Sequence, residues 1–245
     1  PSRVLSVSDS NFVCPQTLVC GQTKFESDTL KTREGNVVIT FLGHGSLMIT
    51  FKGNVVYIDP VSRYADFTQM PKADLILVTH EHGDHLDGAA VEKIRTQKTQ
   101  LVYTQACADN VRGGIVLKNG DERVIERVKV EAVPAYNIVH MRSEGVPFHS
   151  KGSGNGYVTT FGAMRIYVAG DTENIPEMSD LGKIDCAFLP MNLPYTMTPE
   201  MVAEAAKRIK PKILYPYHFG NTNTAQLVEL LKDYKGVEIR IRKLQ

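Results

Sequence analysis

The chain has 245 residues, of which 42% are hydrophobic and 22% charged, and its formal net charge is +1. This composition is typical of a folded protein and excludes disorder, collagen-like repeats and a small disulfide-rich fold. The balanced charge argues against a dedicated nucleic-acid-binding protein, and no apolar run is long enough to span a bilayer. The compartment stays open between the cytoplasm and, if a signal peptide has been removed, the periplasm.

The first half of the chain is predicted to contain mainly short strands. Residues 1–35 are rich in Ser, Thr, Gln and Lys without clear periodicity, which predicts an N-terminal tail. Four runs of apolar and β-branched residues predict strands at 37–41, 46–51, 55–59 and 74–78. Lys52-Gly53-Asn54 is typical of a hairpin turn between the second and third strands. Apolar residues at helical spacing predict a helix over 86–95.

Strands and helices alternate through the second half. The predicted strands lie around 101–104, 115–117, 123–125, 128–133, 157–161, 164–169, 186–189, 212–215 and 237–241. The predicted helices are a short one ending at Ala108, one over 198–209 that Thr198 caps, and one over 224–231. A long loop is expected over 134–155. The pattern predicts one domain over residues 36–245 with an α+β fold, a four-layer αββα sandwich in which two sheets face each other.

Three histidines and an aspartate lie together directly after a predicted strand. His80, His82, Asp84 and His85 fall within six positions of a chain that has seven histidines. In an extended loop, residues two apart point the same way, so His80 and His82 can share one metal ion, and the following pair can face a second. Imidazole nitrogen and carboxylate oxygen suit zinc, and manganese or iron by ligand type alone. The alternative is a solvated loop with Asp84 or Asp87 as a helix cap, which needs one acceptor and not three imidazoles.

From about Val37 to its end, the chain resembles the metallo-β-lactamase superfamily, whose signature is His-x-His-x-Asp-His after a strand. The resemblance implies three further residues of the site. Asp59 would orient a ligand histidine, Asp171 would bridge two metal ions, and His218 would bind the second ion. Each also has a simpler interpretation, with the two aspartates as turn residues and His218 as a buried core histidine.

Two segments resemble one branch of that superfamily, which contains ascorbate-6-phosphate lactonases and relatives of N-acyl-phosphatidylethanolamine phospholipase D. They are Gly43-His44-Gly45-Ser46 and Gly170-Asp171-Thr172-Glu173. The glycines beside His44 permit a close approach of the backbone, so we interpret His44 as a catalytic residue of the pocket, with an ordinary surface histidine as the alternative. Tyr195 and Tyr217 are candidates for the pocket wall or the core.

The third histidine of the first metal site departs from the family pattern. Where the family has a histidine, this chain has Ala135-Tyr136-Asn137, which leaves His140 and His149 as candidates. A predicted hairpin turn at Gly162-Ala163 places Gly156 near Asp171, and His149 lies closer to that point along the chain. We therefore expect His149, not His140, to complete the site, with Asn137 as a hydrogen-bonding residue of the pocket.

A two-metal site of this composition implies hydrolysis. Two cations about 3.5–4 Å apart share a bridging water, lower its pKa and hold a hydroxide against the substrate. Two divalent ions, zinc in the first instance, are expected as cofactors. The expected ligands are His80, His82 and His149 for the first metal ion and Asp84, His85 and His218 for the second, with Asp171 bridging. Asp84 is also expected to orient the hydroxide. All of them should gather at one edge of the sandwich.

The expected substrate is a small molecule such as a lactone or a phosphodiester, although the same kind of metal pair also hydrolyses thioesters and amides. Nucleic acid is not expected as a partner, and the oligomeric state is not predicted. Two other classes of function are a diiron redox protein on the same fold and a binding module with a vestigial site. The redox class needs more carboxylate ligands, and the histidine at position 82 argues against it. The near-complete set of ligands argues against a vestigial site.

Overall fold

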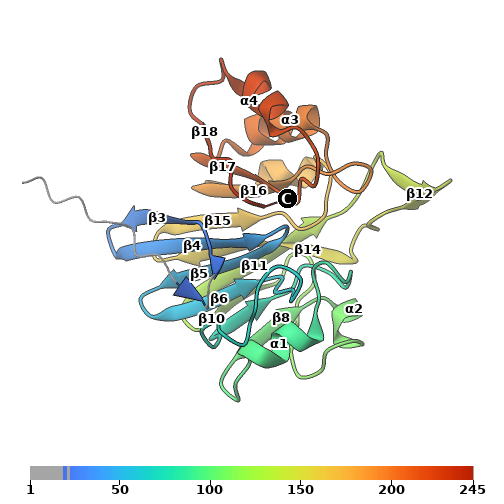
Figure 1. The fold of residues 1–245 in the computed structure, drawn as a ribbon. Helices are drawn as coiled ribbons and strands as arrows, with labels where there is room; N and C mark the ends of the chain where they lie inside the picture. Colours follow the sequence, from blue (N-terminus) through green and yellow to red (C-terminus); the bar gives the residue numbers. More distant parts are fainter. Residues whose placement is uncertain (1–18, 21–22, 245) are drawn as a thin grey trace, which may run out of the picture.

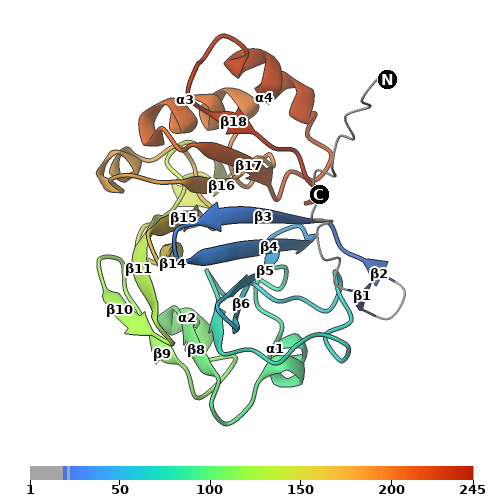
Figure 2. The same ribbon diagram turned by 90° about the vertical axis from the view of Figure 1, so that its left-hand side faces the viewer.

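Two seven-stranded β-sheets pack face to face in the computed structural model, which describes residues 19–20 and 23–244 (Figure 1). Helices α1 (Gly88–Ile94) and α2 (Gln105–Ala108) cover the outer surface of the first sheet. Helices α3 (Pro199–Ile209) and α4 (Thr224–Leu231) cover the second sheet (Figure 2). The predicted α+β sandwich with a helical layer outside each sheet is confirmed.

Both sheets are mixed, and their strands follow the same plan. Each sheet begins with antiparallel hairpins and continues with parallel strands. The first sheet has the order β3 (Ser27–Thr32), β4 (Gly35–Gly43), β5 (Ser46–Phe51), β6 (Asn54–Ile58), β7 (Leu75–Leu77), β8 (Gln100–Tyr103) and β9 (Ile115–Val116). The second has the order β10 (Glu122–Ile125), β11 (Val128–Ala135), β14 (Gly154–Phe161), β15 (Met164–Val168), β16 (Cys186–Pro190), β17 (Ile213–Tyr217) and β18 (Glu238–Ile239).

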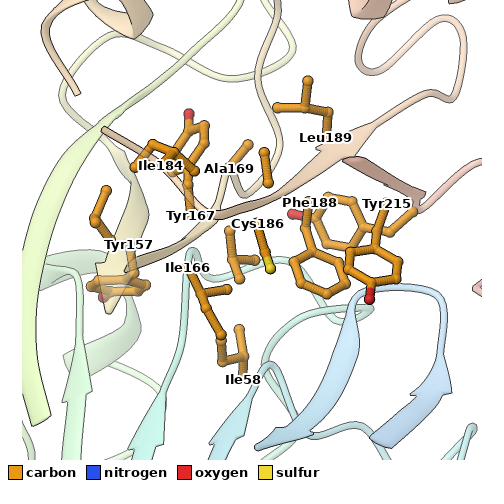
Figure 3. Packing of buried hydrophobic residues seen from close by; sticks show 14 of the residues in the cluster. Ile58, Tyr157, Ile166, Tyr167, Ala169, Ile184, Cys186, Phe188, Leu189 and Tyr215 are labelled. Carbon is orange, nitrogen blue, oxygen red and sulfur yellow. The ribbon is translucent and has the colours of Figure 1, made fainter. Parts of the chain in front are cut away.

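The main hydrophobic core lies between the sheets. Ile58 of the first sheet and Ile166 of the second are both fully buried in it (Figure 3). Phe188 and Tyr215 stack with ring centroids 4.7 Å apart, and Phe41 of the first sheet lies 5.4 Å from Tyr215. Burial of each such side chain contributes roughly 1.5–3 kcal/mol. This packing holds the two sheets together and so fixes where their strand ends meet.

The helix after the histidine motif begins later than predicted. Asp87 is the N-cap of α1, and its carboxylate accepts hydrogen bonds from the backbone N–H groups of Ala89 and Ala90. The helix therefore covers Gly88–Ile94 within the predicted 86–95. Because Asp87 is the cap, Asp84 is free for another role.

The boundary of the folded domain lies earlier than the predicted residue 36. Within the segment predicted as a tail, β3 pairs with β4 along its whole length, and β1 (Val19–Cys20) pairs with β2 (Thr23–Lys24). Only one side chain of β3 is buried, that of Leu30, so its sequence lacks a clear strand pattern. The first 18 residues of the predicted tail lie outside the described part of the chain.

The predicted loop at 134–155 contains a hairpin. Its strands are β12 (Met141–Ser143) and β13 (Val146–Pro147), and it projects from the body of the molecule (Figure 1). The ends of the predicted loop belong to the second sheet, in β11 and β14. Among the described residues, no helix combines the length and the apolar character required to cross a membrane.

Asp28 on β3 ties the first strand of the sandwich to the last part of the chain. Its carboxylate accepts hydrogen bonds from Tyr215 Oη at 2.6 Å, Arg240 Nη1 at 3.0 Å and Arg242 Nη2 at 2.9 Å. Burial raises the pKa of Asp28, but the hydrogen bonds from Tyr215, Arg242 and Arg240 lower it by more. The net result is a pKa below the usual value.

We predict that Asp28→Asn lowers the free energy of unfolding by about 2 kcal/mol, because two guanidinium groups lose their charged acceptor. Urea unfolding at pH 7 measures the change. Glu204→Gln, which removes an exposed ion pair with Lys207, is the control and should cost less than about 1 kcal/mol. Equal stability of Asp28→Asn and wild type would contradict the prediction.

Wild type and Asp28→Asn together also test how the contribution of Asp28 to stability depends on pH. The folded pKa of Asp28 lies below the unfolded value of about 3.9, so its contribution is fully present above that pH. It is lost as the pH falls through the lower, folded pKa. The difference in unfolding free energy between wild type and Asp28→Asn should therefore shrink only below about pH 4.

Candidate metal centre

The predicted site residues lie at one edge of the sandwich, where strands of both sheets end. Asp59 directly follows β6 and His80 follows β7 in the first sheet. Asp171 follows β15 and His218 directly follows β17 in the second. Because the carboxyl ends of parallel strands meet at the same edge, each sheet delivers its polar residues to one place.

The first cluster consists of His80, His82, His149 and Asp171, whose candidate ligand atoms all lie within 4.8 Å of one another. His82 Nδ1 is 3.1 Å from His80 Nε2 and 3.3 Å from His149 Nε2. Asp171 Oδ2 is 3.4 Å from His149 Nε2 and 3.8 Å from His80 Nε2. These atoms converge on a common point, as the ligands of one metal ion do.

The second cluster consists of His44, Asp84, His85 and His218, again within 4.8 Å. Asp84 Oδ2 lies 3.2 Å from His44 Nε2 and 3.4 Å from His218 Nε2. Asp171 Oδ1 lies 3.3 Å from His85 Nε2 and 3.5 Å from His218 Nε2. The Asp171 carboxylate therefore lies between the clusters, with one oxygen facing each of them.

His44, predicted as a residue of the pocket, lies directly among the candidate metal ligands. Its backbone has φ of 52°, and its carbonyl accepts a hydrogen bond from the N–H of His218 at 3.3 Å. The His44 ring lies 3.7 Å from the His218 ring and stacks on Tyr64 at 5.4 Å, measured between centroids. This arrangement brings its Nε2 among the four candidate ligands of the second cluster.

The electrostatics of the two clusters fit divalent cations. Burial lowers the pKa of His149 to about 4, which leaves a neutral imidazole suited to a metal ion. Burial lowers the pKa of His85 too, but the carboxylates of Asp171 and Asp59 raise it by more, so this position attracts positive charge. His85 Nε2, His218 Nε2 and Asp171 Oδ1 are buried without a hydrogen-bond partner, which is costly unless a cation binds them.

Asp59 fixes the orientation of His85 from behind. The Asp59 side chain is fully buried, and its Oδ2 lies 2.7 Å from His85 Nδ1. Thr79 donates to both oxygens of Asp59, from its N–H and its hydroxyl, each at 2.8 Å. A Cβ atom at Gly45 would lie 3.0 Å from the His85 ring and would press on a ring that Asp59 holds in place. With Nδ1 held by Asp59, Nε2 of His85 faces Asp171.

Asn137 holds His149 in a corresponding way. Its Oδ1 accepts hydrogen bonds from Nδ1 of His149 at 2.7 Å and from the His149 backbone N–H at 2.9 Å. Its Nδ2 donates to Glu173 Oε1 at 3.1 Å and to the carbonyl of Tyr195 at 2.9 Å. The Asn137 amide is therefore fully used, and Nε2 of His149 faces the first cluster.

Glu173 anchors the chain next to Asn137. Its buried carboxylate accepts hydrogen bonds from the backbone N–H groups of Ile138, Val139 and His140 at 2.7–2.8 Å. Nδ1 of His140 also lies 2.7 Å from Glu173 Oε1. His140 thus contacts Glu173 and belongs to neither cluster, whereas His149 belongs to the first.

A cavity of about 440 Å³ opens over the two clusters. Beside the clustered residues it is lined by Gly83, Arg142, Phe148, Asn192 and Tyr195. Of the two places predicted for these tyrosines, the pocket wall and the core, Tyr195 lies in the wall. Tyr217 lies in the core, where it is fully buried with its ring edge-on to Phe188 at 5.9 Å.

The sequence does not predict the contacts of Glu173 or the place of Arg142 in the cavity wall. For Glu173 the sequence signal is a carboxylate two residues beyond a strand-end aspartate. Arg142 lies in a segment predicted to be an irregular loop, and no sequence pattern pointed to it.

Comparisons with known proteins agree with this geometry. A family model described as a β-lactamase superfamily domain matches residues 38–218. A metal-dependent hydrolase from Pelotomaculum thermopropionicum is 33% identical over 201 residues, which cover 78% of this chain and 86% of that protein. Another, from Thermococcus kodakarensis, is 33% identical over 198 residues and covers 75% of this chain and 84% of that protein.

Solved structures give the same relationship. A protein from Parabacteroides distasonis, provisionally named a metal-dependent hydrolase, is 49% identical with a TM-score of 0.86. The match covers 90% of this chain and 100% of that chain. CmlA, a diiron β-hydroxylase from Streptomyces venezuelae, has a TM-score of 0.68 at 17% identity and covers 87% of this chain and 54% of that chain. At this low identity, CmlA shares the fold alone.

Glu173→Gln should loosen the chain at 138–140, because the new amide must direct a donor at a backbone N–H or at His140. We expect opening of this segment to become easier by about 1.4 kcal/mol or more, which is at least about tenfold faster hydrogen exchange of these three amides. Glu177→Gln is the control, since Glu177 binds Lys151 and Tyr136 at the surface. Unchanged exchange in Glu173→Gln would show that the carboxylate is not the anchor.

Proposed function

Because the chain belongs to the metallo-β-lactamase superfamily, we propose that it is a hydrolase that uses two divalent metal ions, zinc in the first instance, to cleave a small-molecule substrate. The observation that carries the proposal is the Asp171 carboxylate, which has one oxygen directed at each of two clusters of candidate ligands. A mononuclear site would need only one of these clusters. The assignment to the lactonase and phospholipase branch stays a prediction.

Each metal ion has its own set of protein ligands in this proposal, and Asp171 is shared. The ligands are His80, His82 and His149 for the first ion and Asp84, His85 and His218 for the second. With the shared Asp171 oxygen, the first ion would have four protein ligands, and a fifth position for water or substrate is available because catalytic zinc can become five-coordinate. Asp59 and Asn137 act through His85 and His149, whose rings they orient.

When bound by these residues, two divalent ions would supply Lewis acidity, which would make water a nucleophile near neutral pH and stabilise negative charge that develops on the substrate. The protein supplies orientation. Asp84 orients the attacking water or hydroxide by accepting a hydrogen bond from it, and His44 Nε2, 3.2 Å from Asp84 Oδ2, holds that carboxylate in place. Asp84 is partly exposed to the cavity, so it can reach both water and substrate.

Hydrolysis of a lactone or a phosphodiester is the reaction to test first. The metal-loaded protein should be assayed against panels of both substrate classes, with thioesters and amides as further arms, and its metal content measured in parallel. About two zinc or manganese ions per chain together with turnover would support the proposal. Two iron ions with visible absorbance would support the redox alternative, and absence of metal would support a vestigial site.

His82→Ala should remove activity and leave the fold intact. His82 lies on the loop before α1, outside the hydrophobic core, so its ring holds a metal ion rather than the sandwich. We expect kcat/KM to fall at least about 100-fold and metal content to drop, while thermal unfolding stays cooperative. Loss of cooperative unfolding in the presence of added metal would show that the site is structural.

His149→Ala and His140→Ala form a matched pair. Because only His149 lies in the first cluster, His149→Ala should lose about one metal equivalent and most of its turnover, whereas His140→Ala should keep both. Metal analysis and turnover are measured side by side. Loss of metal only in His140→Ala would reverse the assignment, and equal retention would mean that another ligand fills the position.

A further inference from the structure

The segment between Asn137 and His149 forms an arm beside the cavity. This arm, residues 138–148, contains the β12–β13 hairpin and extends away from the sandwich (Figure 1). Its base is closed by two hydrogen bonds, from the Asn137 N–H to the His149 carbonyl and from the His149 N–H to Asn137 Oδ1, each 2.9 Å long. A residue of the first cluster is therefore part of the base from which the arm projects.

Arg142 is the one Lys or Arg side chain among the residues that line the cavity. Its guanidinium carbon lies 5.9 Å from the centre of the Phe148 ring, which packs edge-on against Tyr195 at 5.1 Å. In the described part of the chain, no carboxylate forms an ion pair with Arg142, so its guanidinium group is available to a ligand. The arm thus presents an unpaired cation and an aromatic surface to the same cavity.

The charge of the cavity adds to that of Arg142. In the proposed function, two divalent ions are held by two carboxylates, Asp84 and Asp171, and by neutral imidazoles. The loaded site then has net positive charge, and a concave site of one sign attracts ligands of the other. A guanidinium group also matches the geometry of a carboxylate or a phosphate, to which it can donate two parallel hydrogen bonds.

We infer that the substrate carries an anionic group, a carboxylate or a phosphate, apart from the bond that is cleaved, and that Arg142 binds this group. The apolar part of the substrate rests on Phe148 and Tyr195. Arg142 is then a residue that determines specificity, and the arm is the element that positions it relative to the metal ions. This inference rests on the proposed function, because it takes the cavity over the clusters as the place where substrate binds.

The test measures binding of three small probes to the full, zinc-loaded chain by calorimetry. Phenylphosphonate and benzoate represent the two anionic groups, and benzamide is the neutral analogue. The variants are Arg142→Gln, Arg142→Lys and the control Arg127→Gln, which removes an arginine in the turn between β10 and β11, outside the cavity. Metal content and turnover on the substrate panels are measured on the same preparations.

Wild type and Arg127→Gln should bind at least one anionic probe about tenfold or more tightly than benzamide. Arg142→Gln should lose roughly tenfold in affinity for that probe and none for benzamide. The affinity of Arg142→Lys should lie between those of wild type and Arg142→Gln, because lysine keeps the charge but cannot make two parallel hydrogen bonds. The anionic probe that responds identifies the group as phosphate-like or carboxylate-like.

Two results would overturn the inference. One is equal affinity of wild type and Arg142→Gln for both anionic probes with metal content unchanged, and the other is no preference of wild type for anions. A wild-type protein that binds metal and hydrolyses a panel substrate, yet gives either result, leaves the proposed function standing. A wild-type protein that holds no metal overturns the proposed function first, and this inference with it.

Discussion

The position of one carboxylate, that of Asp171, sets how the two sheets must meet. Its oxygens face histidines delivered by both sheets, so neither sheet can slide without separating the clusters. The backbone before it is correspondingly tight: a Cβ atom at Gly170 would lie 2.9 Å from the Asn155 carbonyl, and one at Gly156 would lie 2.8 Å from that of Ala169. The close packing of β14 and β15 at these glycines thus also fixes the position of Asp171.

The hydrogen bonds behind the clusters hold two of their histidines, His85 and His149, in one orientation. Asp59 and Asn137 each accept from an Nδ1 atom, which leaves Nε2 of His85 and His149 directed inward. Their own partners are backbone and hydroxyl donors from neighbouring strand ends, together with Glu173. Because several elements hold each orienting residue, the geometry of the clusters belongs to the fold as a whole.

The sequence predicted those parts of the site that depend on local pattern. The motif from His80 to His85 is contiguous, Asp171 ends a clear strand, and the register of one hairpin favoured His149. Features that depend on distant partners were not predictable in the same way. The strand that carries Asp28 has little apolar alternation and is held by Tyr215, 187 positions away, and the role of Glu173 comes from backbone groups 33–35 positions before it.

The closed base of the arm separates the positions of the metal ligands from the length and sequence of the arm, so that one can change without the other. Since the hydrogen bonds between Asn137 and His149 define where the chain leaves and re-enters the body, the length and sequence of residues 138–148 can change while the metal ligands stay in place. Loops with fixed ends and projecting middles are where related enzymes diverge. If the proposed function holds, the same metal centre can serve different substrates through exchange of the eleven residues of the arm, which makes the arm a natural position for grafting a new recognition loop.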